Sequence, residues 1–180
     1  VQPPASGPLA PSLGGLYASG QPDSSYSAIA VPANTQGVRY HFPEVLNASI
    51  AGFVYIDADF NNVLTVGSDP AIAGATIELL NPAGQIVRTT TTNATGFYIF
   101  ADLNPNVVYS VREPLPTGPF RNRPSAVNPG TINGAACATG CTVLVNSPIH
   151  GPNTDLIIDI DLGVGGNGEN FNFGGEPNRS

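Results

Sequence analysis

The sequence predicts an all-β fold, an antiparallel Greek-key β-sandwich of about seven to eight strands preceded by an extended N-terminal arm. Three observations predict this class. The 180 residues include 21 Gly and 18 Pro but only 11% charged residues, a composition that favours short strands joined by turns. No stretch keeps a helical period over three turns. Turn signals recur about every eight to twelve residues, as in all-β sandwiches.

The arm is expected to cover residues 1–46. Its first 25 residues are rich in Pro, Gly and Ser, which is typical of an extended linker. Two apolar segments follow, "YSAIAVP" and "VRYHFPEVL", whose alternation favours strands. Such an arm has too little apolar surface to order itself alone, so we expect these segments to pair with a sheet edge of this chain or of a neighbour. The residues expected to make that contact are Tyr26, Ile29, Val31, Val38, Tyr40 and Phe42.

The sandwich domain is expected to cover residues 47–180, with strands in eight segments: "SIAGFVYI", "GATIELL", "QIVRTTTT", "GFYIFADL", "VVYSVRE", "TVLVN", "DLIIDIDL" and "NFNFG". In the seventh, the apolar residues at positions 156, 158 and 160 predict one apolar face, and the aspartates at 159 and 161 predict a face that becomes polar. Residues 114–134 contain five prolines. We therefore expect a long surface loop around 114–141.

The charge balance disfavours two classes of partner. Thirteen acidic residues against six arginines, with no lysine, give a net charge of −7, so nucleic acid and anionic membranes are not expected as partners. No apolar run is long enough to cross a bilayer. The chain starts at Val1, and we expect a mature exported protein, secreted or at the cell surface.

The two cysteines agree with that compartment. Cys137 and Cys141 stand four residues apart in a Gly-containing turn, where they can form a small disulfide in an oxidising environment. Such a ring stabilises by roughly 2 kcal/mol. We expect it to hold a loop rather than the fold.

Four segments resemble one family: "SIAGFVYIDADFNN", "DPAIAGATIELLNPAGQ", "TTTTNATGFYIFADLNPNVVYSVRE" and "GENFNFGG". They are similar to the B-type repeat domains of bacterial surface adhesins, the SdrD B-like and Cna B-like group with a transthyretin-like sandwich. The third carries the hairpin pattern "T-x-G-x-Y-x-F" followed by "L-x-P-x-x-Y-x-V-x-E". Many Cna B-like domains contain a Lys–Asn isopeptide bond, which this chain excludes because it has no lysine.

The resemblance implies a calcium loop after the first strand. "YIDADFNN" places Asp57, Asp59 and Asn61 at every second position, as the first three ligands of an EF-hand-like loop. The Val63 carbonyl and Asp69 would complete the set, with Asp69 one residue beyond the usual closing position. Asn62 stands where Gly usually makes the sharp turn, and Asn tolerates that backbone. A loop held only by solvent and by side-chain to backbone hydrogen bonds is the alternative, and both interpretations stay open.

We do not expect an enzyme. A zinc site could be assembled only from the two cysteines, His41 and His150, whose spacing matches no recognised pattern. His150 near Asp155 is better interpreted as a surface neighbour than as part of a nucleophilic triad. Asp159 and Asp161 share a strand without an obvious pocket. Apart from calcium, no cofactor is expected.

The functional hypothesis is a non-enzymatic secreted structural protein. It would be a subunit of an extracellular filament or surface layer, in which the N-terminal arm adds a strand to a neighbouring subunit, so that its main partner is a second copy of itself. The alternative is a monomeric cell-surface adhesin or carbohydrate-binding module with a host or matrix ligand.

Overall fold

The structure is a computed structural model that describes residues 16–18, 25–38, 40, 46–114, 120–122, 127–137, 140–145 and 154–177. The chain divides into two units, Val1–Val45 and Leu46–Ser180. Each unit is described by itself.

The described part of the first unit contains a small hairpin. Strand β1 (Leu16–Ala18) pairs antiparallel with β2 (Ser25–Ser27), and Tyr17 lies opposite Tyr26. Tyr26 thus pairs with a nearby segment of the arm itself, at a small loop-closure cost, and its expected contact with a sandwich sheet stays a prediction. Val31 and Val38 are 56% and 43% exposed. Ile29 and Tyr40 are half-buried, and Phe42 lies outside the described residues.

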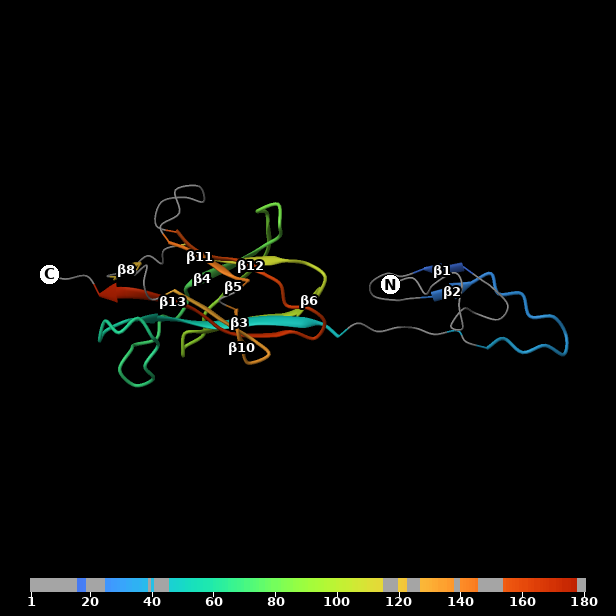
Figure 1. Cartoon of the computed structure of the whole chain (residues 1–180), viewed down its shortest axis with the longest axis horizontal. Coiled ribbons are helices and arrows are strands. Elements are labelled where there is room, and N and C mark those ends of the chain that lie inside the picture. Colours follow the sequence, from blue (N-terminus) through green and yellow to red (C-terminus); the bar gives the residue numbers. More distant parts are fainter. Residues whose placement is uncertain are drawn as a thin grey trace. The chain divides into compact units, whose positions relative to one another are not determined.

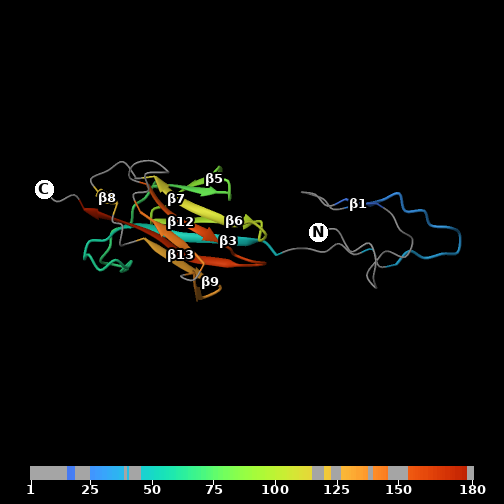
Figure 2. The ribbon, with the colours of Figure 1, turned by 45° about the horizontal axis from the view of Figure 1, so that its top comes forward.

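The second unit is a sandwich of two sheets, seen in Figure 1 and, turned, in Figure 2. The six-stranded sheet has the order β10-β9-β13-β3-β6, with β8 also paired to β13. Its strands are β3 (Ala48–Ile56), β6 (Phe97–Leu103), β8 (Phe120–Asn122), β9 (Asn128–Ile132), β10 (Ala135–Ala136) and β13 (Asn167–Pro177). The five-stranded sheet has the order β11-β12-β7-β4-β5. Its strands are β4 (Thr76–Leu80), β5 (Ile86–Thr91), β7 (Tyr109–Pro114), β11 (Thr142–Leu144) and β12 (Thr154–Ile160).

The predicted all-β sandwich is confirmed, and each of the eight predicted segments contains a strand. One pairing departs from the antiparallel expectation, because the last strand, β13, runs parallel to the first sandwich strand, β3. The described sandwich also has more strands than the seven or eight expected, since β8, β9 and β10 lie between residues 114 and 141.

The expected long loop around 114–141 is therefore wrong for the residues described there. Strand β9 pairs with β13 despite containing Pro129. Strand β10 pairs only with Thr131 and Ile132 of β9. On that side Pro129 has no neighbouring strand among the described residues, so β9 is an edge strand at this position. Proline is tolerated there because its missing N–H removes no ladder bond.

A bulge also changes the predicted face of β12. Its register with β7 shifts between Ile157 and Ile160, and Asp159 has a φ of 62°. The extra residue brings Ile157 and Ile160, three positions apart, onto the same inward face. Both belong to the core cluster between the sheets. Leu156 and Ile158 lie outside that cluster, although Leu156 is only 1% exposed. The strict alternation expected for 156–161 holds only up to the bulge.

The core lies between the two sheets. It combines aromatic and aliphatic side chains of β3, β6 and β13 with aliphatic side chains of β4, β7 and β12, among them Ile50, Val54, Tyr98, Phe100, Phe171, Phe173, Ile77, Leu79, Val111 and Ile157. The Cys137–Cys141 disulfide forms as predicted, and both cysteines are buried members of this core. The disulfide thus contributes apolar packing as well as closing a turn.

The six-stranded sheet depends on a close approach of backbone between β13 and β3. The register of β13 on β3 shifts between Gly168 and Phe173. A Cβ atom at Gly52 would lie 1.9 Å from the Phe171 carbonyl oxygen, so only glycine fits. The Tyr98 hydroxyl, from β6, donates a hydrogen bond of 2.6 Å to the same carbonyl.

The turn between β5 and β6 is fixed by Asn93 and Gly96. The Asn93 Oδ1 atom accepts hydrogen bonds from the backbone N–H groups of Thr95 and Phe97 at 2.9 and 3.1 Å. Gly96 has a positive φ of 75°, and its carbonyl accepts the N–H of Val54 at 2.9 Å.

The substitution Gly96→Ala is expected to destabilise the domain more than Gly84→Ala. Both glycines have a φ of 75°, but a Cβ at position 96 would lie 2.4 Å from the Val54 carbonyl oxygen, whereas position 84 is open. The left-handed backbone alone costs about 1 kcal/mol, and the clash at position 96 adds to it. Guanidinium unfolding of both variants measures the difference. Equal losses would contradict the steric argument.

Candidate functional site: an acidic loop and a buried acid pair

The acidic loop begins where β3 ends. Its base is closed by two backbone hydrogen bonds, from Ile56 N–H to the Pro70 carbonyl at 2.8 Å and from Asp57 N–H to the Gly175 carbonyl at 2.9 Å. The loop therefore leaves and returns at one point beside β13. This closure brings Asp57 and Asp69 together although they are twelve residues apart in the chain.

Three carboxylates gather in this loop. One oxygen of each of Asp57, Asp59 and Asp69 lies within 4.8 Å of the others. Asp57 is 0% exposed and Asp69 8%, whereas Asp59 is exposed. Placing like charges so close, with two of them shielded from water, requires compensating interactions.

Backbone N–H groups supply part of that compensation. Asp57 accepts from the N–H groups of Asn61 and Asn62, both at 3.1 Å. Asp69 accepts from the N–H groups of Ala58 and Thr65, at 3.0 and 2.7 Å. The two carboxylates thus fix the loop backbone from both sides, as side-chain to backbone bonds do in turns.

The loop geometry matches several of the expected EF-hand-like features. Asn62 has a φ of 67°, as expected where glycine usually makes the sharp turn. Asp69 closes the loop against Asp57, although it lies one position later than the usual closing acid. The Asn61 Oδ1 atom accepts the Val63 N–H at 2.7 Å, and the Val63 carbonyl accepts from the Thr65 hydroxyl at 3.4 Å. Hard carboxylate and carbonyl oxygens are the ligand type that calcium prefers, so this donor set fits calcium.

In the part of the chain that the structure describes, the other candidates for metal or catalytic chemistry form no second cluster. Cys137 and Cys141 are joined to each other with a Cα separation of 5.3 Å, which removes them as zinc ligands. His41 and His150 lie outside the described residues. Asp159 and Asp161 are both exposed.

A second acidic site was missed by the sequence prediction. Glu113 of β7 and Asp155 of β12 lie directly opposite each other, and they are 3% and 0% exposed. Tyr98 of β6 lies close enough for the Glu113 charge to affect its ionisation. The period-two alternation of Tyr109, Val111 and Glu113 would have revealed the inward position of Glu113, because the first two are core residues.

Burial determines the ionisation of this acid pair. Burial raises the pKa of Glu113 well above its ordinary value of 4.5, and the neighbouring Asp155 raises it further. Burial also raises the pKa of Tyr98 above 10.0, with a smaller contribution from Glu113. Two adjacent buried carboxyls share a proton more readily than they both ionise. Because a substrate has almost no access to either group, the arrangement favours a structural role.

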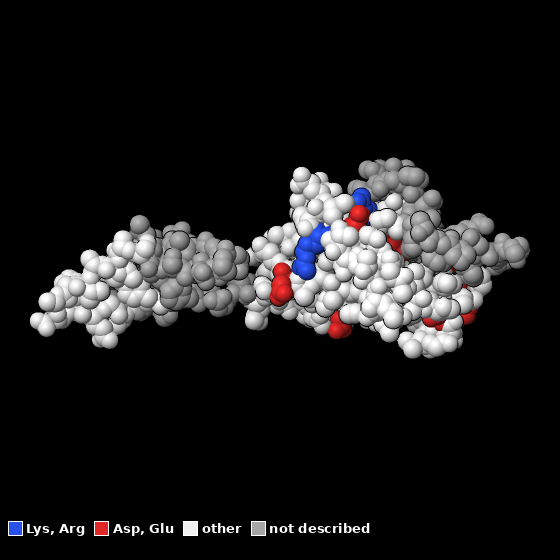
Figure 3. Space-filling model, turned by 180° about the vertical axis from the view of Figure 1, so that it is seen from behind, with Lys and Arg blue, Asp and Glu red and all other residues white. Residues whose placement is uncertain are grey.

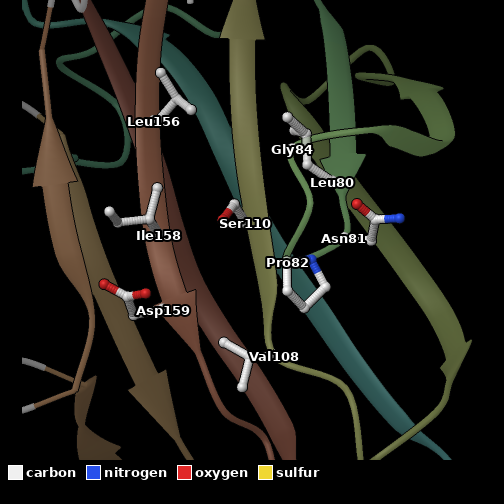
Figure 4. Close-up of a pocket in the computed structure, with 9 residues that line it drawn as sticks. All are labelled: Leu80, Asn81, Pro82, Gly84, Val108, Ser110, Leu156, Ile158 and Asp159. Carbon is white, nitrogen blue, oxygen red and sulfur yellow. The ribbon is translucent and has the colours of Figure 1, made fainter. Parts of the chain in front are cut away.

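The outer side of the five-stranded sheet carries a pocket of about 240 Å³. Figure 4 shows Ser110 of β7 between Leu80 on one side and Leu156 and Ile158 on the other. Among the described residues that line it, Asp159 is the one acidic residue and none is basic. The pocket therefore offers apolar contact but no paired groups for acid–base chemistry.

The substitution Glu113→Gln is expected to change how stability depends on pH. Below pH 4.5, Glu113 is protonated in the folded and unfolded chains. As the pH rises, the unfolded chain loses this proton first, because its pKa is the lower one. The free energy of unfolding therefore falls by up to about 1.4 kcal/mol per pH unit. The fall ends when the pH passes the pKa of Glu113 in the folded chain. Glutamine cannot ionise, so the variant should gain in melting temperature over the wild type from pH 4 towards neutral pH. The exposed Glu169→Gln serves as control, and parallel pH profiles for wild type and Glu113→Gln would contradict this assignment.

Comparison with curated proteins gives a short partial match. A segment of 57 residues, 32% of the chain, is 37% identical to Colossin-A of Dictyostelium discoideum. The matched segment is less than 1% of the length of Colossin-A, so the chain spans only a very small part of that relative.

Within the residues that the structure describes, no helix has both the length and the apolar character that a membrane crossing needs.

The family model of the SdrD B-like domain matches residues 48–162. The matched region starts at the first residue of β3 and includes the acidic loop, the β5–β6 turn and the buried acid pair. Domains of this family are non-enzymatic structural domains and typically occur in surface proteins. The match covers well over half of the chain, and the chain therefore belongs to the SdrD B-like domain family.

Proposed function

We propose that this protein is a non-enzymatic, extracellular structural subunit that assembles with copies of itself. Its N-terminal arm adds an extended segment to a sheet edge of a neighbouring sandwich domain. Strand addition suits such a segment because main-chain hydrogen bonds supply affinity and alternate side chains supply specificity. A head-to-tail contact of this kind need not close, so it generates a filament or a surface layer.

The observation that carries this proposal is the exposed apolar surface of the arm. Val31 and Val38 are 56% and 43% exposed. The described arm residues carry no charge, and none is coloured as charged in Figure 3. Exposed apolar side chains such as these are poorly solvated and favour association.

Deletion of residues 1–45 should convert an assembled protein into a monomer. The sandwich keeps its own core, so circular dichroism and the melting transition of the truncated protein should remain those of a folded β domain. Mass photometry of both proteins over a range of concentrations measures the assembly. A full-length protein that stays monomeric would reject the proposal and leave the monomeric adhesin-type domain.

We further propose that the acidic loop binds one calcium ion through Asp57, Asp59 and Asp69, with Asn61 and the Val63 carbonyl as additional oxygen ligands. The clustered carboxylates, two of them buried, support this proposal. A bound cation relieves their mutual repulsion and stiffens the loop between β3 and β4. Its role is mechanical, in keeping with a structural domain.

Calcium should raise the melting temperature of the wild type, and Asp69→Asn should abolish that rise. At a calcium concentration 100 times the dissociation constant the stabilisation is about 2.7 kcal/mol, or roughly 5–10 °C for a domain of this size. Asp161→Asn removes the same charge outside the loop and should keep the full response. Calorimetry in calcium and in chelator measures each shift, and an unchanged wild-type melting temperature would rule the ion out.

A further inference from the structure

The open sheet edges of the sandwich differ in how well they can accept a strand. In the described residues the two sheets end at β5, β6, β10 and β11. Strands β10 and β11 have two and three residues, whereas β5 and β6 have six and seven. The part of β9 beyond β10 is also an edge, but it is short and contains Pro129. Only β5 and β6 therefore offer a ladder long enough for a stable added strand.

The edge of β6 is already largely occupied. The N–H of Val54 bonds the Gly96 carbonyl, and hydrogen-bonded positions alternate along an antiparallel pair. The backbone groups of Phe97 and Ile99 therefore point away from β3. Those of Phe97 are both used, because its carbonyl accepts the Asn93 N–H at 2.9 Å and its N–H donates to Asn93 Oδ1 at 3.1 Å.

Arg88 occupies the other end of the β6 edge. Its guanidinium donates a hydrogen bond to the Ala101 carbonyl and lies 5.8 Å from the centre of the Phe100 ring. This side chain comes from β5 and reaches across to the other sheet. An arginine in this position protects an edge strand, as charged side chains on sheet edges commonly do.

The edge of β5 has no such protection in the described residues. The N–H of Thr92 bonds the Ala75 carbonyl at 3.0 Å, and by the same alternation the backbone groups of Thr89 and Thr91 point away from β4. Ile86 and Val87, at the start of the strand, are 49% and 47% exposed. The one charged side chain of β5, Arg88, is directed to β6. A β-branched edge without Lys or Pro, whose one charged side chain is turned towards another strand, is a template for strand addition.

From these contacts we infer that β5 is the edge that accepts the arm of a second copy of this chain, through the segment 36–42, "QGVRYHF". This inference rests on the proposed function. The segment lies between Pro32 and Pro43 and contains no proline, and Val38, Tyr40 and Phe42 alternate along it, as an added strand requires.

The charges favour the arm segment, rather than a second sandwich domain, as the partner that binds the β5 edge. Residues 46–180 contain five Arg and eleven Asp or Glu, a net charge of −6, so two domains placed edge to edge repel each other. The segment 36–42 contains Arg39 and no acidic residue. The positive charge of Arg39 is attracted by the net negative charge of the sandwich domain.

A matched pair of edge prolines tests this inference in the full-length protein. Thr89→Pro removes an N–H that points to the open edge of β5 and leaves the β4 ladder intact, because the hydrogen-bonded positions are the neighbouring ones. Ile99→Pro does the same at β6. Thr89→Lys adds a charge to the edge without changing the backbone. It tests whether β5 accepts the arm if the proline variant fails to fold. Mass photometry gives the fraction assembled, and circular dichroism checks the fold.

The expected result is a wild type that assembles, an Ile99→Pro variant that assembles like it, and Thr89 variants that are folded and at least tenfold less assembled at the same concentration. Folded Thr89 variants that assemble like the wild type would overturn the choice of β5 while leaving arm-mediated assembly in place. Loss of assembly in Ile99→Pro as well would overturn the selectivity between edges. A wild type that is monomeric at every concentration overturns both the proposed function and this inference.

Discussion

The parallel pairing of β13 with β3 is the constraint on which the rest of the sandwich depends. It places the last strand beside the first, so β3 becomes a central strand with β6 on its other side. The contact needs Gly52, because the Phe171 carbonyl occupies the space of a side chain there. The same ladder supplies the Gly175 carbonyl that holds Asp57 at the base of the acidic loop. Fold closure and loop geometry thus share one set of backbone contacts.

The two acidic sites of the domain differ in how their charge is compensated. In the loop, backbone N–H groups converge on Asp57 and Asp69, and the cluster opens to solvent at Asp59. In the core, Glu113 lies opposite Asp155, and burial together with the Asp155 carboxylate raises the pKa of Glu113. A solvent-open carboxylate cluster held by backbone N–H groups favours a cation, whereas a buried carboxyl with a raised pKa makes the stability of the fold depend on pH.

In the described residues, the sandwich combines a well-packed core with an unprotected sheet edge at β5. Aromatic residues of β6 and β13 fill the core, and the disulfide packs within it. Asn93 and Arg88 bond to exposed backbone groups of β6. Along β5 the open backbone positions belong to threonines, and its one charged side chain, Arg88, contacts β6 instead. Unequal protection of two edges on the same domain is a means of directing assembly to one of them.

The sequence by itself determined the all-β class, the eight principal strand segments, the β5–β6 turn and the disulfide, because alternation, turn residues and cysteine spacing are local signals. Only the tertiary structure decided the strands within 114–141, the bulge at Asp159, the inward face of Glu113 and the pairing of Tyr26 within the arm. Each of these depends on a partner distant in sequence or on a register shift, and composition and periodicity carry no information about either. For the same reason the sequence could place Asp57 and Asp59 in one loop, but their proximity to Asp69 required the loop to close on β13.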